Sequence, residues 1–342
     1  MATARTAQKP VISVIMANYN CEAYLAGAIR SVLGQSLQEI EIILVDDGST
    51  DNSVKIAREL AKADKRLRVY SGKRLGGPAP VRNFALDKAK GDWIAIVDSD
   101  DLILPDRLER MLTAAVTRKA DILIDNLAIF QSDGSPGIAT MFEGDLKTTP
   151  ASVMESEYIR ANALFGTGTK LGYAKPIIRR SALDAHDVRY NEAMRIGEDY
   201  DLIVRMLSAG CRLLTIPDAM YFYRKHDQSI SHRLDTESLM ALKTAAEDAL
   251  GRPTPHAEVT AAHAARLNSI QRAISYDTVI RSLKEKQVFR AIGLLRDNPS
   301  VLPLLRLPVM DRIKTGLGQY LPHQSEPQLE SQLAQLRTEC GA

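Results

Sequence analysis

The sequence has almost no excess of charge of either sign, and this limits the partners that composition alone can suggest. Its 342 residues hold 44 Lys and Arg against 42 Asp and Glu, a formal net charge of +2. Proteins that bind nucleic acid or an anionic membrane through their overall charge carry a larger basic excess. We therefore expect no nucleic-acid partner and look for binding chemistry in local groups of residues.

Cysteine and long apolar runs are scarce as well. The three cysteines, Cys21, Cys211 and Cys340, are widely spaced and form no C-x-x-C pair, which argues against a zinc site or a disulfide framework. Neither the opening MATARTAQKP nor any later run approaches the roughly 20 apolar residues that a membrane span needs. We expect a cytoplasmic protein, with the inner face of the cell membrane as an alternative location.

The first third of the chain alternates apolar runs with segments of helical periodicity. The apolar runs are typical of buried strands, and the segments between them place apolar side chains at helical spacing. This alternation indicates a mostly parallel sheet with helices on both faces. The expected strands lie in residues 11–20, 39–46, 66–72 and 93–97, and the expected helices within residues 22–35, 53–64 and 76–91.

Polar clusters follow three of these strands: ANYN at 17–20, VDDGSTD at 45–51 and VDSDD at 97–101. Parallel sheets bind ligands at the carboxyl ends of their strands, so we expect the clusters to share one binding site. Each cluster alone is also typical of an ordinary turn. Asp98 and Asp100 form a D-x-D pair of hard oxygen ligands suited to Mn²⁺ or Mg²⁺, for which a nucleoside diphosphate is the natural partner.

Several segments carry a resemblance to a known family. They are VISVIMANYN, EIILVDDGSTDNS, GGPAPVRNFAL, GDWIAIVDSDD, LPDRLERM, GEDYDLIVRML and YFYRKHDQSIS. In this order and spacing the chain resembles the inverting glycosyltransferases of family 2, strongly over residues 11–110, more patchily through residue 232, and not beyond. The resemblance implies an α/β fold of GT-A (Rossmann-like) type, a mostly parallel sheet flanked by helices, with a C-terminal helical appendage.

The resemblance and the helical pattern together predict the domain boundaries. We expect a GT-A domain over residues 1–234, with a nucleotide-sugar half at 11–110 and an acceptor and catalytic half at 111–234. Residues 235–342 are expected to be helical, ending in a tail that is either a short exposed helix or disordered. The apolar, basic stretch at 300–321 either packs within this appendage or rests on a membrane beside a lipid-linked acceptor.

The resemblance also assigns the donor residues. It implies that Ala17 and Tyr19 line a nucleobase pocket and that Asp47 accepts a hydrogen bond from a uracil-like ring. It further implies that Asp98 contacts the ribose and Asp100 the metal ion. A carboxylate can accept from an imide N–H or a ribose hydroxyl, while the ion prefers the carboxylate nearest the diphosphate.

Two basic side chains have two interpretations each. The family pattern brings Arg82 to the nucleotide, and the alternative is a solvated arginine at a helix start. The family often has a histidine at the position of His226, near the metal or diphosphate, so we expect it to join Asp98 and Asp100 as a ligand. An isolated histidine is otherwise a structural hydrogen-bonding residue.

Glu198 and Asp199 are the candidates for activating an acceptor. They lie where a helix should begin, since the apolar residues after them have helical spacing, and the dipole there favours anionic side chains. Helix capping alone would also explain an aspartate at this position. The resemblance makes Asp199 the catalytic base and Glu198 its neighbour, and two adjacent carboxylates can raise the pKa of one of them.

The expected function is transfer of a sugar from a nucleoside diphosphate donor, most simply a UDP-sugar, to an acceptor hydroxyl with inversion. The acceptor would be a saccharide or lipid-linked saccharide in bacterial surface polysaccharide synthesis, by family analogy. A nucleotidyltransferase is one alternative, but the N-terminal MANYNCEAY lacks the glycine and lysine of a phosphate loop. A noncatalytic sugar-nucleotide-binding protein is the other, and the retained carboxylates argue against it.

Overall fold

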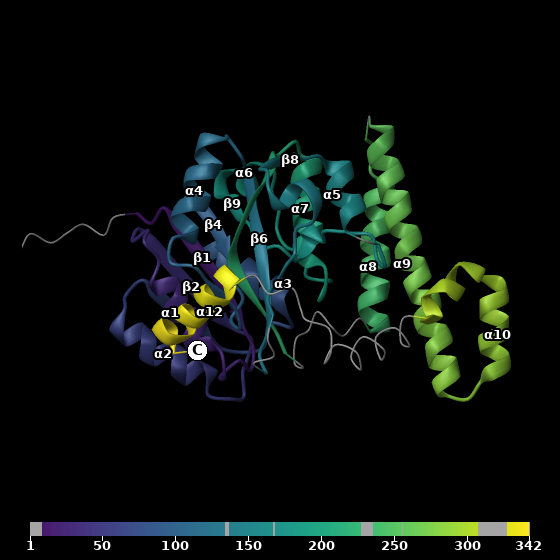
Figure 1. The fold of residues 1–342 in the computed structure, drawn as a ribbon, viewed down its shortest axis with the longest axis horizontal. Helices are drawn as coiled ribbons and strands as arrows, with labels where there is room; N and C mark the ends of the chain where they lie inside the picture. Colours follow the sequence, from purple (N-terminus) through teal and green to yellow (C-terminus); the bar gives the residue numbers. More distant parts are fainter. Residues whose placement is uncertain are drawn as a thin grey trace, which may run out of the picture.

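The computed structural model describes residues 9–133, 137–166, 168–226, 235–254, 256–306 and 327–341, which form one ten-stranded sheet with helices on both faces (Figure 1). Its strands are β1 (Ile12–Asn18), β2 (Ile40–Asp46), β3 (Leu67–Ser71), β4 (Trp93–Ile96), β5 (Leu102–Ile103), β6 (Ile122–Gln131), β7 (Ala139–Thr140), β8 (Ala151–Val153), β9 (Ile177–Arg179) and β10 (Leu213–Lys225). The main path runs β3-β2-β1-β4-β9-β6-β10-β5, while β7 pairs with β6 and β8 with β10.

The longest ladders of this sheet are parallel. β1 pairs in parallel with β2 and β4, β2 with β3, and β6 with β10. The exception inside the sheet is β9, which lies antiparallel between β4 and β6. The expected mostly parallel α/β sheet is therefore confirmed, with short antiparallel strands added to it.

The first half of the chain follows the expected order of strands and helices. Its helices are α1 (Leu25–Leu33), α2 (Ser53–Ala63), α3 (Pro78–Lys88) and α4 (Arg107–Thr117). Every residue of β2 is buried, which explains the apolar run at residues 42–45. Alternate residues of the strands face opposite layers: Val14 packs with α1 and α2, whereas Ile15 packs with α3.

The second half of the sheet carries shorter elements around one long helix. They are η1 (Gly144–Lys147), α5 (Glu155–Ala161), η2 (Leu171–Tyr173), α6 (Arg180–Ala185) and α7 (Glu198–Ser208). α7 buries Leu202, Ile203 and Met206 against the sheet, as its periodicity predicts. Its first residues therefore stay at the edge where the parallel strands end.

The C-terminal region is helical, as expected. It consists of α8 (Thr236–Gly251), α9 (Ala257–Lys284), α10 (Val288–Asp297), η4 (Pro299–Arg306) and α12 (Pro327–Cys340). α8 and α9 lie side by side next to α5 and α7, and α10 lies at the outer end of the molecule (Figure 1). Within the part of the chain that the structure describes, none of these helices combines the length and hydrophobicity needed to traverse a bilayer.

The last helix corrects one expectation. α12 is neither disordered nor simply exposed, because Leu329, Leu333 and Leu336 are buried in the core that α1 also lines (Figure 1). Their spacing of four and three residues makes one apolar stripe along the helix. Residues 307–321 of the stretch considered for membrane contact lie outside the described residues, and the division at residue 234 stays a prediction.

Candidate functional site

The three polar clusters come together at one edge of the sheet. Asn18 and Asp46 are paired in the β1–β2 register, and Asn18 Nδ2 donates to Asp46 Oδ1 over 2.7 Å. The Cys21 thiol, just after the first cluster, donates to the carbonyl oxygen of Ser99 over 3.3 Å. This is the carboxyl end of β1, β2 and β4, where a parallel sheet places its ligands.

The residues expected to hold the nucleobase surround the segment before α3. Asp47 is buried, and its Oδ1 accepts hydrogen bonds from the backbone N–H groups of Leu75 and Gly76. Tyr19 is 40% exposed, and the Arg74 guanidinium lies over its ring at 4.6 Å from the centroid. Ala17, half-buried, precedes them on β1. Asp47 thus fixes the loop 75–76 beside an accessible aromatic ring.

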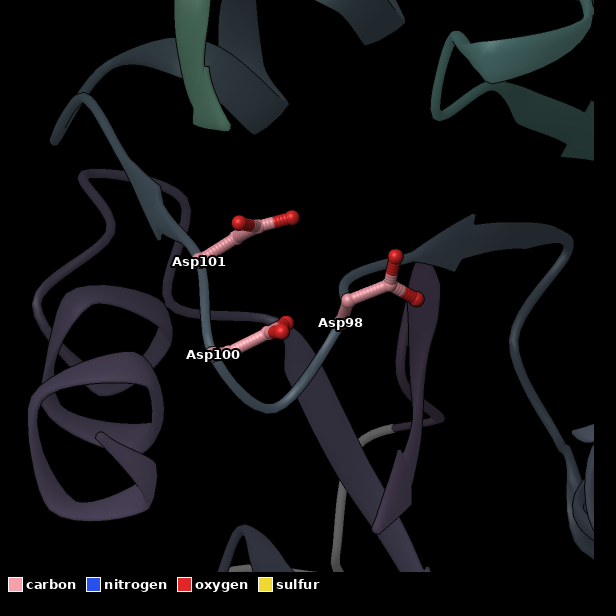
Figure 2. Close-up of side chains that lie close together, drawn as sticks. All are labelled: Asp98, Asp100 and Asp101. Atoms are coloured by element: carbon pink, nitrogen blue, oxygen red, sulfur yellow. The ribbon is translucent and has the colours of Figure 1, made fainter. Parts of the chain in front are cut away.

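Three carboxylates crowd the loop after β4. Side-chain oxygens of Asp98, Asp100 and Asp101 lie within 4.8 Å of one another, and Figure 2 shows all three on this short loop. Asp101 is buried and accepts from the Tyr221 hydroxyl and the Arg224 backbone N–H, each at 2.7 Å. Burial and the neighbouring carboxylates raise the pKa of Asp101 well above its usual range.

The chemistry of these side chains fits a hard divalent cation. Oxygen-rich groups with few protein ligands suit Mn²⁺ and Mg²⁺, and a cation would relieve the repulsion among the three carboxylates. Asp100 is the most available ligand, with a side chain 27% exposed and His226 Nε2 at 2.8 Å from its Oδ2. Asp98 is less available, because both its oxygens already accept hydrogen bonds from cations.

Arg82 is one of those cations and lies at the centre of the site. It is only 4% exposed, so the alternative of a solvated arginine is wrong. Its guanidinium donates to Glu198 at 2.6 Å, Asp199 at 3.1 Å and Asp98 at 2.9 Å. Although burial opposes the charged form, the Asp199 and Asp98 carboxylates hold the pKa of Arg82 well above its usual range.

Lys175 is the second cation, and no motif in the sequence pointed to it. Its buried Nζ lies 2.8 Å from Asp98 Oδ2 and 3.0 Å from Asp199 Oδ2. Burial alone would raise the pKa of Asp98, but Lys175 and Arg82 lower it to about 2. Arg82 and Lys175 therefore hold both Asp98 and Asp199. Asp98 is the residue expected at the donor ribose, and Asp199 is the expected base.

The backbone of Lys175 is anchored independently. Its carbonyl oxygen accepts from Arg107 Nη2 over 2.6 Å. Arg107 in turn forms two hydrogen bonds of 2.8 Å with Asp125, and both side chains are fully buried. A buried ion pair with two hydrogen bonds holds a fixed geometry, so it fixes the backbone from which the Lys175 side chain extends.

A glycine turn presents the two candidate catalytic carboxylates. Gly197 has φ of +82°, a backbone conformation that favours glycine, and a Cβ there would lie 2.8 Å from Leu242 Cδ2 of α8, the movable end of that side chain. Glu198 and Asp199 then begin α7, as expected. Burial and the Asp199 carboxylate raise the pKa of Glu198. The C-terminal helices therefore pack directly behind the residues that present these carboxylates.

Comparison with known proteins identifies the family. The model described as Glycosyl transferase family 2 matches residues 13–182. The succinoglycan biosynthesis protein ExoO of Rhizobium meliloti is 32% identical over 305 residues, which cover 89% of this chain and 86% of that protein. This chain belongs to glycosyltransferase family 2. ExoU of the same organism is 30% identical over 308 residues, covering 88% of this chain and 87% of the relative.

Solved structures confirm the GT-A fold of this family 2 enzyme. The structure of S. aureus TarS 1–349 in complex with UDP-GlcNAc has a TM-score of 0.62, with 24% identity, over 75% of this chain and 72% of that one. The mannosyltransferase PcManGT from Pyrobaculum calidifontis, in complex with GDP-Man and Mn²⁺, has a TM-score of 0.57 and 17% identity, over 97% and 87%.

The family likeness extends further than the motifs did. The family model ends at residue 182, but the match of 305 residues to ExoO must extend beyond residue 232, so this relative also resembles the C-terminal helices. The C-terminal helices carry no short motif, because many side chains satisfy the same apolar periodicity. Likeness spread over such positions is found by comparing whole chains and not by recognising short segments.

Proposed function

We propose that this family 2 glycosyltransferase moves a sugar from a nucleoside diphosphate donor, a UDP-sugar, to an acceptor hydroxyl with inversion. One observation carries the proposal: Arg82 and Lys175 each contact both Asp98 and Asp199. Two buried cations thus join Asp98, which is expected at the donor ribose, to Asp199, which is expected to act as the base. Such an arrangement suits a reaction in which donor and acceptor must meet at one point.

The donor side rests on Asp47, Tyr19, Ala17 and Asp98. We propose that the uracil ring lies beside Tyr19, with its imide N–H directed at the Asp47 carboxylate. The hydrogen bonds from Leu75 and Gly76 occupy Asp47 Oδ1, which leaves Oδ2, 3.9 Å from Arg74 Nε, as the oxygen to accept from the base. The TarS structure with UDP-GlcNAc, a structural neighbour, supports a donor of this class.

The acceptor side rests on Asp199. We propose that its carboxylate takes the proton of the acceptor hydroxyl as that oxygen attacks the anomeric carbon from the face opposite the leaving diphosphate. A single displacement inverts the configuration and needs no covalent intermediate. Arg82 and Lys175 hold the Asp199 carboxylate in position, while Glu198, whose pKa is raised, shares Arg82 beside it.

The carboxylate loop supplies the metal ligands in this proposal. Asp100 would hold a Mn²⁺ or Mg²⁺ ion, and Asp98 and His226 lie close enough to contribute. When bound, such an ion stabilises the negative charge that develops on the leaving diphosphate. The acidic cluster supports this assignment, as does the Mn²⁺ in the PcManGT structure.

The biological setting follows from the relatives. ExoO and ExoU are succinoglycan biosynthesis proteins that match this chain along most of its length. We propose a role in bacterial surface polysaccharide synthesis, with a saccharide or a lipid-linked saccharide as acceptor.

Release of free nucleotide tests the proposed function. The purified protein is incubated with a panel of nucleotide sugars and saccharide acceptors, with Mn²⁺ or Mg²⁺, and UDP and pyrophosphate are measured separately. The proposal expects UDP release from at least one UDP-sugar, together with a glycosylated acceptor. Pyrophosphate release would indicate a nucleotidyltransferase, and donor binding without turnover across the panel would indicate a binding protein.

A further inference from the structure

The outer face of α10 carries apolar side chains that no other part of the described chain covers. Phe289 is 92% exposed, Ile292 57% and Val288 51%. These three residues define the α10 outer face, because positions three and four residues apart lie on one side of a helix. The opposite side packs inward: Ala291 is buried in a small core with Val279 and Val301. α10 therefore has apolar side chains on two sides, one buried in this small core and one exposed to solvent.

The segment that contains α10 is basic. Residues 281–306 contain six basic and two acidic side chains, so this segment has an excess of four positive charges in a chain whose net charge is +2. The rest of the chain is consequently slightly acidic. The basic residues are Arg281, Lys284, Lys286, Arg290, Arg296 and Arg306; all six are exposed, and Arg281 pairs with Asp277 just before the segment.

The α10 outer face also lies apart from the reaction site. α10 follows the 28-residue helix α9, and Figure 1 shows it at the end of the molecule opposite the α1 and α2 side of the sheet. A helix of that length extends about 40 Å. A partner bound to α10 can therefore occupy the surface without covering the carboxylates at the strand ends.

We propose that the α10 outer face binds the surface of an anionic lipid bilayer. An exposed aromatic ring and two aliphatic side chains suit the boundary between headgroups and acyl chains, and the exposed lysines and arginines of residues 281–306 suit anionic headgroups. The charge decides against a second copy of this chain, because a symmetric pair would bring two equally basic segments together. The inference does not depend on the proposed donor, base or metal ion.

Binding to lipid vesicles tests the inference. The full chain is sedimented with vesicles of phosphatidylcholine alone and of phosphatidylcholine with phosphatidylglycerol, at low and high salt. We expect binding only to the anionic vesicles, weakened by salt. The double variant Phe289→Ser/Ile292→Ser should lose at least about 10-fold in vesicle affinity, since two large apolar side chains no longer leave water.

A matched control is available on another helix. Val116 of α4 is 56% exposed, and Val116→Ser should leave vesicle binding unchanged. Circular dichroism melting checks that the double variant is folded, and its turnover of a soluble acceptor should equal that of the wild type. The inference is overturned if the wild type ignores anionic vesicles, if it binds both vesicle types equally, or if the double variant binds as the wild type does. A dimer that the double variant disperses, without vesicle binding, would also overturn it in favour of a second copy.

Discussion

The Lys175 ammonium and the Asp199 carboxylate lie 3.0 Å apart, with both side chains largely buried. Because Lys175 also contacts Asp98 at 2.8 Å, a change on the donor side of the site reaches the candidate base through one side chain. Lys175 is therefore a positioning residue in this account. It holds the base and does not itself touch the reacting atoms.

Lys175→Met tests this positioning role. The substitution leaves Asp98 and Asp199 with Arg82 alone, so their mutual repulsion should move Asp199, and we expect kcat to fall at least about 10-fold. If Lys175 acts through Asp199, adding Lys175→Met to the Asp199→Asn variant should lower kcat by less than about a further threefold. Steady-state kinetics of the four proteins measures this coupling.

A nearby lysine provides the control for that cycle. Lys170 Nζ donates to the Ala163 carbonyl oxygen over 2.9 Å and contacts none of the catalytic carboxylates. Lys170→Met should therefore leave kcat near the wild-type value. Full additivity of Lys175→Met and Asp199→Asn would show that Lys175 only supports the fold.

Asp100→Ala tests the metal assignment without a catalytic assay. If Asp100 is the main ligand, UDP should bind the wild type more weakly after EDTA treatment, and Asp100→Ala should bind UDP weakly with or without Mn²⁺. Isothermal titration calorimetry measures both. Asp218, a carboxylate on the protein surface, gives the control variant Asp218→Ala. Equal UDP affinity with and without EDTA in the wild type would rule the metal ion out of donor binding.

Asp47→Asn tests the nucleobase assignment through specificity. The amide can keep its oxygen on the Leu75 and Gly76 N–H groups, which leaves an NH₂ group facing the site. That group opposes the N–H of uracil but can donate to the ring nitrogen of cytosine. We expect UDP affinity to fall about 10-fold or more, with CDP gaining relative to UDP. An unchanged preference for UDP over CDP would remove Asp47 from the base pocket.

Local pattern was sufficient for the elements and for much of the site. The apolar run at residues 42–45 of β2, the periodicity of α7 and the polar clusters after the strands each follow from a few adjacent residues. The carboxyl ends of parallel strands lie at one edge of a sheet, so the clusters that follow them meet at that edge. Asp98 follows from this pattern alone, whereas the roles expected for Arg82 and Asp199 came from the resemblance to family 2.

Residues whose role depends on distant partners could not be found in this way. Lys175 precedes a three-residue strand, and its partners Asp98 and Asp199 lie far from it in the sequence. The apolar stripe of α12 is visible, but its partner α1 is near the other end of the chain. Both cases need the folded arrangement, because a single side chain or stripe does not specify what it contacts.

The central claim is that Asp199 is the base, and its amide variant tests the claim most directly. Asp199→Asn keeps an oxygen for Arg82 but removes the basicity, so kcat should fall at least about 10²-fold while the Kd for UDP changes less than about threefold. Glu198→Gln should lower kcat less than Asp199→Asn does, because Glu198 lies beside the base and has a raised pKa. The measurement is turnover of the identified donor beside a UDP titration of each variant. Near wild-type turnover in Asp199→Asn, with Glu198→Gln inactive, would contradict the account and make Glu198 the base.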